Sequence, residues 1–490
     1  MHEAEQEDVK RPGAVWLAAV GEVALSLALG FYHLGHKSIW LDEGYSAIQS
    51  TGGWARAAGD SSAGGNMAGY NYLLSLWRVF GDGEFALRSL SVVAAGAAVF
   101  VVFLVGARLF SDAVGLVAGF VIAVSPIFVH FSQETRSYAL TALLVSLASY
   151  FFVLSVERQR WWCWALYAVT AATSCYVHFT ASFVILASAG SLLLLPPRRL
   201  PLRQILYTAL GLGALLFPIV FMVPKSERSP SSNQNLRVVP GVISQIAGGR
   251  VLAIVVFGLC CIPLVLLVRA LRTDGRSLDS WRLGFVLLWI AVPIPLALTA
   301  ALTHVNAFEG RYMLVAVPAL ALGVGVAIMH LPSRALAAGF LVLIALLSAM
   351  NVANGYQLPA HEDWRGVAAY VTSAGAGPQD GLVFCPAWTR PPYQYYELRE
   401  PPEDRPHPLS PSGPWNDELR WHPVHAQDVA GWSSTPQRIW VLSSYFDKIT
   451  PAGGCDLKAS MRGRKRTLRT TIGDVVIERY DLTGPAATGR

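Results

Sequence analysis

Two neighbouring carboxylates, Asp42 and Glu43, lie just beyond the first long apolar stretch of the chain. A carboxylate in such a place can act as a general base, which removes the proton from a hydroxyl group. Acidic residues are also favoured in the first turn of a helix, where they cap free N–H groups and complement the helix dipole. Both interpretations stay open, because a residue that caps a helix can also serve as a base.

A second polar segment spans His130–Tyr138 and contains Glu134 and Arg136. If this segment is helical, His130, Glu134 and Tyr138 share one face at i, i+4 spacing. A histidine and a glutamate on one face can ligate a metal, although two ligands without a third give little support to a metal site. The alternative is an interfacial polar network, with Tyr138 as a residue of an aromatic belt.

Two later positions also combine polar chemistry with apolar surroundings. His178 interrupts the apolar run Trp161–Leu195, which is too long for one membrane span, so the chain must turn near His178 and bring it to the membrane surface. A lone histidine at a turn is more often structural than catalytic. Glu309 and Arg311 stand just before Tyr312, and the guanidinium of Arg311 could reach lipid head groups or bind a substrate phosphate.

The composition indicates what class of protein carries these residues. Of the 490 residues, 53% are hydrophobic and 14% are charged, whereas soluble domains carry about 25% charged residues. This composition excludes an ordinary soluble enzyme. The net charge of +6 comes from 38 Lys+Arg against 32 Asp+Glu, and without a long basic run it argues against nucleic acid as a partner.

Apolar stretches of near-spanning length recur through the first two thirds of the chain, and a bilayer needs about 20 apolar residues per helix. A soluble core does not need so many in succession, so we expect a polytopic, mainly α membrane protein with about 11 transmembrane helices. The expected spans are Val15–Tyr32, Leu90–Ala107, Ala113–Val129, Tyr138–Val156, Trp161–Val177, Phe179–Leu195, Ile205–Val223, Val251–Val268, Leu283–Leu302, Tyr312–Met329 and Ala335–Met350.

The arginines predict the orientation of these spans. Lys and Arg concentrate in short cytoplasmic loops, and a cytoplasmic amino terminus places such residues in every second loop, from Arg108 to Arg334. The opposite loops, which hold residues 33–89 and His130–Arg136, are then exoplasmic. An odd number of spans also puts the carboxyl terminus outside the cytoplasm. We therefore expect a multi-pass protein of the cell (plasma or inner) membrane.

The chain changes character after the last apolar block. We expect a membrane domain over residues 1–353, with its first exoplasmic loop at 33–89, and a small exoplasmic α/β domain over residues 354–490. Within the latter, the pattern predicts a helix at Glu362–Ser373, a loop at Pro401–Pro414, and strands at Gly381–Cys385, Arg438–Tyr445 and Thr471–Asp481. Cys385 and Cys455 are its two cysteines, and they could form a disulfide or stay free.

The order of the polar motifs along the chain resembles the GT-C glycosyltransferase superfamily. It is most similar to the branch that holds protein O-mannosyltransferases and lipid A aminoarabinose transferases. The resemblance covers roughly Trp40–Pro318 and rests on the acidic pair, Gln133–Tyr138, the turn at His178 and Arg311-Tyr312. Further similar segments are Gly64–Met67, Tyr70–Leu74, Phe80–Arg88 and His361–Arg365.

The resemblance implies that a sugar passes from a polyprenyl-phosphate carrier to an acceptor at the outer membrane face, with inversion of the anomeric centre. The donor has a built-in leaving group, so the protein must take a proton from the acceptor and stabilise the departing phosphate. The implied partners are the lipid-linked sugar, the bilayer, and a glycan or lipid acceptor rather than protein. The enzyme would be a hexosyl- or pentosyltransferase.

The resemblance also implies roles for particular residues. Asp42 is the expected base, and Glu43 supports it or orients the acceptor. Guanidinium groups grip phosphate as a bidentate fork, so Arg136 and Arg311 are expected at the donor phosphate. The expected substrate- and phosphate-binding residues are together Arg88, Glu134, Arg136, Tyr138, His178, Glu309 and Arg311.

One departure from the pattern concerns a metal. Aminoarabinose transferases carry Glu-Lys-Pro where this chain has Gly64, Gly65 and Asn66. The metal ligand and phosphate-binding lysine of that subgroup are therefore missing. We expect a metal-independent reaction, so that a divalent cation is not supported as a cofactor and aminoarabinose is not the expected sugar.

Two other classes of protein compete with this interpretation. A multi-pass flippase or transporter of lipid-linked sugars is the main alternative, but such proteins often show internal repeats and broken spans at the midplane, and no repeat is evident here. The second alternative is a membrane scaffold with an exoplasmic binding domain. It would not explain why the acidic pair and Gln133–Arg136 lie in neighbouring loops on one side of the membrane. A transferase predicts that Asp42, Glu134, His178 and Arg311 line one outward cavity.

Overall fold

The computed structural model describes residues 12–51, 68–219, 236–302, 308–358, 362–410, 412, 436–444, 461 and 463–482. The chain divides into two compact units, of which the first comprises Met1–Tyr32 and Arg88–Gln357, and the second His33–Leu87 and Leu358–Arg490. Residues 33–87, which were expected within the membrane domain, group with the carboxyl-terminal residues in this division. The domains predicted at 1–353 and 354–490 stay predictions.

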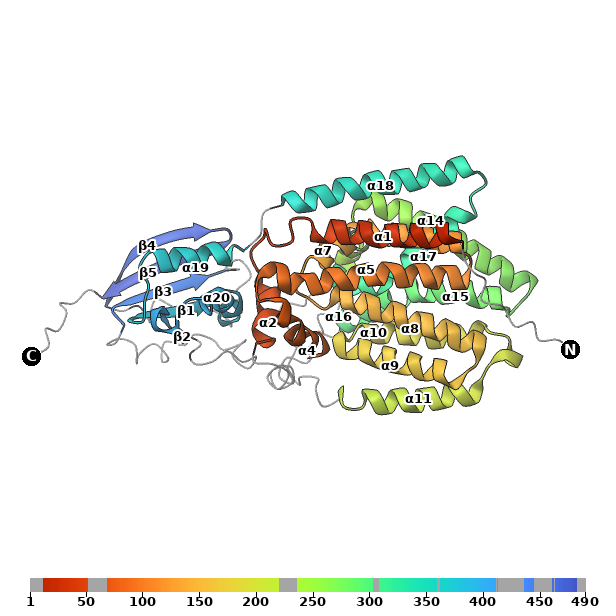
Figure 1. The fold of residues 1–490 in the computed structure, drawn as a ribbon, viewed down its shortest axis with the longest axis horizontal. Coiled ribbons are helices and arrows are strands. Elements are labelled where there is room, and N and C mark those ends of the chain that lie inside the picture. Colours follow the sequence, from red (N-terminus) through yellow and green to blue (C-terminus); the bar gives the residue numbers. More distant parts are fainter. Residues whose placement is uncertain are drawn as a thin grey trace, which may run out of the picture. The chain divides into compact units, whose positions relative to one another are not determined.

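The first unit is a set of long apolar helices that run side by side (Figure 1). Helices are the expected structure in a bilayer, because a helix satisfies its backbone N–H and C=O groups internally where no water is available. The helices are α1 (Gly13–Phe31), α5 (Glu84–Leu109, whose first turn is counted with the second unit), α6 (Asp112–Ala123), α7 (Pro126–Ser132), α8 (Tyr138–Arg158), α9 (Trp161–Val177), α10 (Ala181–Ser191), α11 (Leu202–Leu216), α13 (Val239–Ala247), α14 (Arg250–Thr273), α15 (Leu278–Ala291), α16 (Pro293–Leu302), α17 (Val317–Met329) and α18 (Arg334–Gln357). Short 3-10 turns are η2 (Leu192–Leu194), η3 (Pro197–Arg199), η4 (Leu236–Val238) and η5 (Gly310–Ala316).

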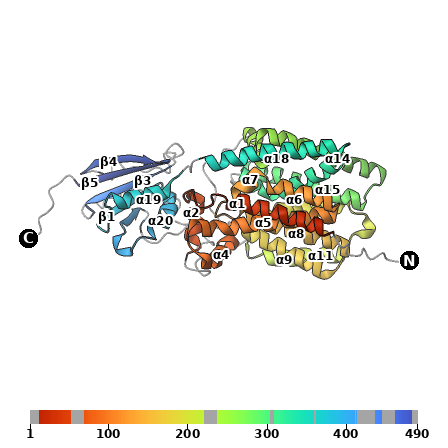
Figure 2. The same cartoon turned by 45° about the horizontal axis from the view of Figure 1, so that its top comes forward.

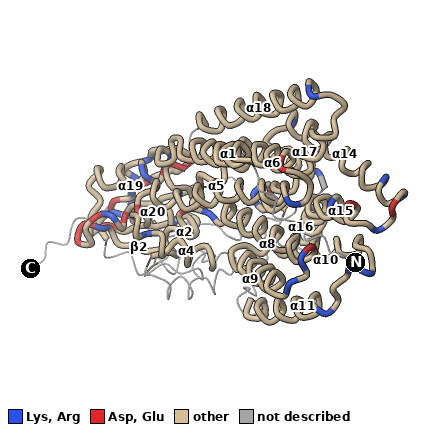
Figure 3. Tube along the Cα trace, turned by 45° about the vertical axis from the view of Figure 1, so that its right-hand side comes forward, with Lys and Arg blue, Asp and Glu red and all other residues tan. Residues whose placement is uncertain are grey.

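Seven helices within the described residues are long and apolar enough to cross a membrane, or eight if the bent pair α6 and α7 forms one span. Charged residues along the trace lie mainly at the helix ends and in the second unit (Figure 3). The mainly α membrane architecture is therefore confirmed. Every predicted apolar block contains a helix, but the count of 11 spanning helices is not confirmed.

Two features explain the lower count. The block predicted at Ala113–Val129 is bent by 61° between α6 and α7, because Pro126 lacks an N–H group and its ring obstructs the preceding helical turn. In addition, α9, α10 and α11 have 17, 11 and 15 residues. At 1.5 Å per residue, even 17 residues span only about 25 Å, short of a hydrocarbon core of about 30 Å.

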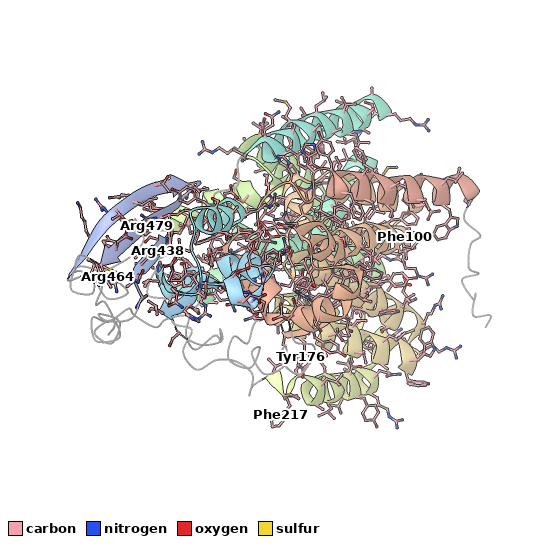
Figure 4. The ribbon with its side chains drawn as sticks, turned by 60° about the vertical axis from the view of Figure 1, so that its left-hand side comes forward. Phe100, Tyr176, Phe217, Arg438, Arg464 and Arg479 are labelled. Atoms are coloured by element: carbon pink, nitrogen blue, oxygen red, sulfur yellow. The ribbon has the colours of Figure 1, made fainter. Side chains whose placement is uncertain are left out.

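Small residues let these helices approach one another closely. A Cβ atom added to Gly106 on α5 would lie 2.8 Å from the Cα of Gly115 on α6, and one added to Gly325 on α17 would lie 2.7 Å from the Val114 carbonyl. Small residues at helix interfaces are typical of membrane bundles, where packing replaces the hydrophobic effect. Farther out, the Tyr176 hydroxyl donates to the Leu215 carbonyl at 2.8 Å and ties the end of α9 to α11 (Figure 4).

The second unit combines helices with one mixed sheet (Figure 2). Its helices are α2 (Leu41–Gln49), α4 (Ala68–Trp77), α19 (Trp364–Ser373) and α20 (Arg390–Glu397), with 3-10 turns η1 (Arg78–Phe80), η6 (Ala387–Thr389) and η7 (Pro402–Asp404). Its strands are β1 (Asp380–Cys385), β2 (His407–Ser410), β3 (Arg438–Ser443), β4 (Arg464–Ile472) and β5 (Val475–Leu482).

The sheet has the strand order β2-β1-β3-β5-β4. Strand β1 pairs in parallel with β2 and β3, while β5 pairs antiparallel with β3 and β4. The apolar residues of β1 and β3 are fully buried, whereas Arg438, Arg464 and Arg479 carry charge on three of the strands (Figure 4). The small α/β part predicted for the carboxyl-terminal region is therefore confirmed.

Two local predictions in this region were wrong. The strand expected over Thr471–Asp481 is instead a hairpin, in which Ile472 pairs with Val475 and Gly473 adopts a φ of +53° in the two-residue turn. The loop expected at Pro401–Pro414 contains the short strand β2. Proline is tolerated there because β2 lies at an edge of the sheet, where one side of the strand needs no N–H donor.

The cysteines fall into two groups. Cys385 at the end of β1 is disulfide-bonded. Cys385 is therefore not free. Cys455 lies outside the described residues, so its own state stays a prediction. Four cysteines of the first unit are free, as their apolar surroundings predict, and these are Cys163, Cys175, Cys260 and Cys261.

Candidate functional site

Three segments of the first unit converge on His178. This residue follows α9 and precedes α10, so the predicted turn is confirmed, but its side chain is only 1% exposed rather than open at a surface. Its ring centroid lies 5.8 Å from that of Tyr138 and 5.4 Å from that of Tyr312, and it stacks on Phe179 at 5.0 Å. The starts of α8 and η5 therefore meet the α9–α10 turn at this histidine.

The hydrogen bonds of His178 determine which ring nitrogen carries its proton. The Thr180 backbone N–H donates to Nδ1 at 3.3 Å, and the Thr180 hydroxyl lies 2.8 Å from the same atom. Nδ1 is therefore an acceptor, and a neutral ring carries its proton on Nε2. Among the described residues, Nε2 is buried without a hydrogen-bond partner.

The surroundings of His178 keep it neutral. Burial lowers the pKa of this imidazole to about 3, and the positive charges of Arg136 and Arg311 add to that effect. A buried N–H donor beside two guanidinium groups creates a region of positive electrostatic potential. Such a region is suited to an anion that brings several acceptor oxygens, as a phosphate does.

The two arginines are held in different ways. Arg136 is 8% exposed, its guanidinium lies 5.8 Å from the centre of the Tyr138 ring, and the Ser91 hydroxyl donates to its carbonyl at 3.2 Å. Nε of Arg311 lies 2.6 Å from a carboxylate oxygen of Glu309, and its guanidinium lies 5.1 Å from the centre of the Tyr312 ring. Aromatic faces and one carboxylate thus hold both cations near His178.

The segment between α7 and α8 differs from the helical prediction. His130 lies on α7, Glu134 lies in a turn and Tyr138 begins α8, so the three residues do not share a helix face. Nε2 of His130 and Oε1 of Glu134 are nevertheless 3.4 Å apart. The tight turn is stabilised by Gln133, whose amide donates to the carbonyls of Gly30 and Tyr32 at 3.0 and 2.7 Å.

Arg88, the remaining expected substrate-binding residue of this unit, lies in the first part of α5. Its side chain is 4% exposed. It precedes Ser91 by three residues, so it shares a helix face with the residue that bonds to Arg136. Arg88 therefore lies one helical turn from Ser91, whose hydroxyl donates to the Arg136 carbonyl.

A small apolar pocket lies between elements that also carry this cluster. Pro126 begins α7, which leads to Glu134, and Val317 follows η5, which carries Arg311. Gly248 closes α13 with a φ of +86°, and a Cβ there would lie 2.6 Å from Pro126. The pocket is lined by Val121, Ile122, Ser125, Pro126, Ile246, Ala247, Leu252, Val256, Val317, Leu320, Ala321, Ile344 and Ser348.

The acidic pair belongs to the second unit. Asp42 and Glu43 lie in the first turn of α2, as the helix-start interpretation predicts. Glu43 is fully buried and accepts a hydrogen bond from the Trp40 N–H at 3.4 Å, which completes the helix cap. Asp42 is half-buried. Glu43 is therefore engaged by the fold, whereas Asp42 is the more accessible carboxylate of the two.

Some residues that shape these two regions were not predicted as site residues. Thr180 sets the tautomer of His178. Glu362, which follows the last long helix, is 1% exposed and accepts a hydrogen bond from the Trp364 indole. The His361–Arg365 motif pointed to Glu362 without assigning it a role. No sequence signal distinguishes Thr180 from the many other small polar residues of the chain.

No group of three His, Cys, Asp or Glu side chains able to hold a metal occurs within the described part of the chain. Gly64–Asn66, where the aminoarabinose transferases have their motif, lies outside it. The expectation of a metal-independent reaction stays a prediction.

Comparison of the whole fold with solved structures decides its class. The chain is similar to ArnT from Cupriavidus metallidurans bound to undecaprenyl phosphate, with 14% identity, a TM-score of 0.61, and coverage of 96% of this chain and 98% of that one. The apo form of the same protein gives a TM-score of 0.63 at 14% identity, with coverage of 95% and 98%. The chain has the GT-C fold. The resemblance inferred from the motifs is thereby confirmed.

Other comparisons agree with this GT-C assignment. The archaeal oligosaccharyltransferase AglB from Archaeoglobus fulgidus, in complex with an inhibitory peptide and a dolichol-phosphate, is 11% identical, with a TM-score of 0.54 and coverage of 94% of this chain and 74% of that one. A family model described as dolichyl-phosphate-mannose-protein mannosyltransferase matches residues 69–223. This segment runs from α4 to α11 and includes Arg136 and His178. No curated protein matches the chain.

Proposed function

We propose that this protein is a glycosyltransferase that moves a sugar from a polyprenyl-phosphate carrier to an acceptor hydroxyl of an envelope glycan or lipid. The observation that carries the proposal is the buried, unpartnered Nε2–H of His178 between the charges of Arg136 and Arg311, within the described residues. A phosphate offers acceptor oxygens to all three groups. Two of the structures that are similar to this chain contain undecaprenyl phosphate or a dolichol-phosphate, which supports a lipid-linked donor.

The apolar pocket fits the other end of such a donor. Pro126 and Val317, which line it, stand close in sequence to the segments that carry Glu134 and Arg311. A polyprenyl chain is wholly apolar and is attached directly to its phosphate. We propose that the phosphate binds at the arginines and that the first part of the lipid chain runs toward this pocket.

The proposed reaction is a single displacement. The acceptor oxygen attacks the anomeric carbon, the bond from that carbon to the phosphate oxygen breaks, and the bonding electrons leave with the polyprenyl phosphate. Asp42 takes the proton of the acceptor hydroxyl, while Arg136 and Arg311 stabilise the charge that develops on the phosphate. Attack opposite to the leaving group inverts the anomeric centre, and we propose that this occurs at the outer membrane face.

The remaining site residues have supporting roles in this proposal. Glu309 orients Arg311, and Tyr138 packs against both Arg136 and His178. Glu134 holds the α7–α8 turn together with His130. Glu43 supports Asp42 by completing the cap of α2.

The test uses purified protein in lipid discs, a panel of polyprenyl-phosphate sugars and crude envelope acceptors. Release of free polyprenyl phosphate is measured for the native chain and for Asp42→Asn, which we expect to lower the rate about 100-fold or more, as the loss of a general base does. Asp112→Asn is the matched control, because Asp112 is also a half-buried aspartate in the first turn of a helix, α6. Its rate should equal that of the native chain.

Three outcomes would contradict the proposal in different ways. Native turnover in Asp42→Asn would refute the base assignment alone. Absence of release with every donor, while lipid-linked sugar crosses the bilayer, would indicate a flippase instead. An equal loss in both variants would show that damage to a helix start, and not a missing base, lowers the rate.

A further inference from the structure

Helix α2, which carries Asp42 in its first turn, packs against the segment that forms η6 and α20. The Tyr45 hydroxyl donates to the Trp388 carbonyl at 3.2 Å. A Cβ atom added to Gly44 would lie 2.6 Å from the Pro392 nitrogen, so the two backbones meet without a side chain between them. Within the second unit, the carboxyl-terminal region therefore contacts α2 directly.

A third contact lies just before α2 begins. The Ile39 N–H donates to the Tyr396 hydroxyl at 2.8 Å, and the same hydroxyl donates to Oε1 of Glu84 at 3.0 Å. The Ser38 hydroxyl lies 3.2 Å from it. Tyr396 is 6% exposed, and its burial raises the pKa of Tyr396 to about 12, so the phenol keeps the proton that it donates. One hydroxyl group therefore connects the chain before α2 to α20 and to the start of α5.

The chain before α2 is held from α19 as well. The Arg365 guanidinium donates to the carbonyls of residues 35, 36 and 37 at 3.1–3.3 Å, and its Nε lies 3.1 Å from Oε1 of Glu84. The Arg365 N–H donates to the Ser38 hydroxyl at 3.0 Å. Residues 35–39 are thus bound to both α19 and α20, and α2 begins from a fixed point.

These contacts bracket Asp42 along the chain. Ile39 is bound before Asp42, and Gly44 and Tyr45 are held after it. The backbone hydrogen bonds of a helix make its first turn move as one piece, so a displacement at either side also displaces the carboxylate. Misplacement of a catalytic group by about 1 Å can lower a rate about 100-fold. The position of Asp42 therefore depends on α20.

We propose that Tyr396 is a positioning residue for Asp42, because its hydroxyl fixes the chain that leads into α2 and with it the place of the carboxylate. This inference rests on the proposed role of Asp42 as the base. The carboxyl-terminal region then serves catalysis by holding α2. Loss of the hydroxyl leaves the Ile39 N–H and the Glu84 carboxylate with one partner fewer, and a buried donor without its partner favours movement of the chain.

The first measurement does not depend on turnover. Hydrogen–deuterium exchange of residues 39–49 is followed by mass spectrometry on the full chain in lipid discs. Tyr396→Phe removes only one hydroxyl group, and the loss of its hydrogen bond should speed this exchange about three- to tenfold. Tyr45→Phe, which removes the bond to Trp388, should speed it in the same way and provides a second test of the contact between α2 and the carboxyl-terminal region.

A matched control is the neighbouring residue of α20. Tyr395 is 4% exposed, close to the 6% of Tyr396, and its hydroxyl donates to the Asp82 carbonyl at 2.7 Å rather than to the chain before α2. Tyr395→Phe thus removes the same group at the same burial. It should keep the native exchange of residues 39–49 and the native kcat.

A kinetic measurement separates positioning from general damage. Tyr396→Phe should lower the kcat of polyprenyl phosphate release about tenfold. It should leave the KM of the donor unchanged, because the donor phosphate is proposed to bind at arginines of the first unit. In the Asp42→Asn background the same change should leave the remaining rate unaltered, since a residue that acts only through Asp42 then has no base to position.

The outcomes are distinct. Native exchange in Tyr396→Phe would overturn the proposal whether or not the protein transfers sugar. An equal loss of rate in the native and Asp42→Asn backgrounds, or a Tyr395→Phe variant that behaves like Tyr396→Phe, would also overturn it. If the native chain releases no polyprenyl phosphate, the proposed function fails, and the exchange measurement still decides whether Tyr396 fixes α2.

Discussion

The clearest prediction concerns the phosphate-binding role of Arg311. Its guanidinium is held by Glu309 at 2.6 Å and lies over the Tyr312 ring. A hydrogen bond to a charged group contributes about 1.5–3 kcal/mol, and 1.36 kcal/mol corresponds to a factor of ten. Arg311→Gln should therefore weaken the binding of undecaprenyl phosphate about 10- to 100-fold. The Glu309 carboxylate loses its ion pair with Arg311 in this variant, and its negative charge should move the result toward the larger value.

A matched control exists within the same unit. Nε of Arg108 lies 2.6 Å from a carboxylate oxygen of Glu157, and the exposure of its side chain is 23% against 22% for Arg311. Arg108→Gln thus breaks an ion pair with the same Nε–oxygen distance and a similarly exposed arginine away from the His178 cluster, and should leave the dissociation constant unchanged. A lysine at position 311 keeps the charge without the planar fork and should give an intermediate value.

The assay is competition of undecaprenyl phosphate against a fluorescent polyprenyl-phosphate analogue on protein in lipid discs, at fixed ionic strength. Thermal unfolding of each variant checks that the fold is intact. Native affinity in Arg311→Gln would refute the reasoning. Equal weakening in Arg108→Gln would show that the loss of an ion pair at a helix end, rather than of a phosphate ligand, accounts for the effect.

The other predictions concern His178 and Gly44. His178→Ala should weaken undecaprenyl phosphate binding about 10- to 100-fold, the effect of one hydrogen bond to a charged phosphate oxygen. Because the pKa of His178 is lowered to about 3, the ratio between variant and native affinity should be constant from pH 5 to pH 8, and a larger ratio at pH 5 would indicate a charged imidazolium. Gly44→Ala should lower the stability of the second unit by about 1–3 kcal/mol, because the new Cβ would lie 2.6 Å from the Pro392 nitrogen; calorimetry that gives native stability would contradict this close approach of α2 and α20.

Much of the architecture follows from local properties of the chain. Each apolar block contains a helix because apolar residues in a bilayer leave the backbone no partner other than itself. Three further features could be predicted because the residues that determine them are neighbours in sequence. They are the start of α2 at Asp42 and Glu43, the turn at His178, and the strands β1 and β3. The strand expected over Thr471–Asp481 was wrong because one turn glycine, Gly473, is enough to fold it into a hairpin.

Other features depend on residues that are distant in sequence, and only the tertiary structure decides them. The neutral state of His178 results from burial together with Arg136 and Arg311, which lie on other segments. Likewise, the Arg365 N–H donates to the Ser38 hydroxyl from a segment that follows the last membrane helix. A hydrogen bond or a desolvation energy exists only when packing brings its two partners together, so sequence spacing alone predicts neither. The amino-acid sequence thus determined the helices, the GT-C resemblance and the candidate residue types, whereas packing decided their protonation and their partners.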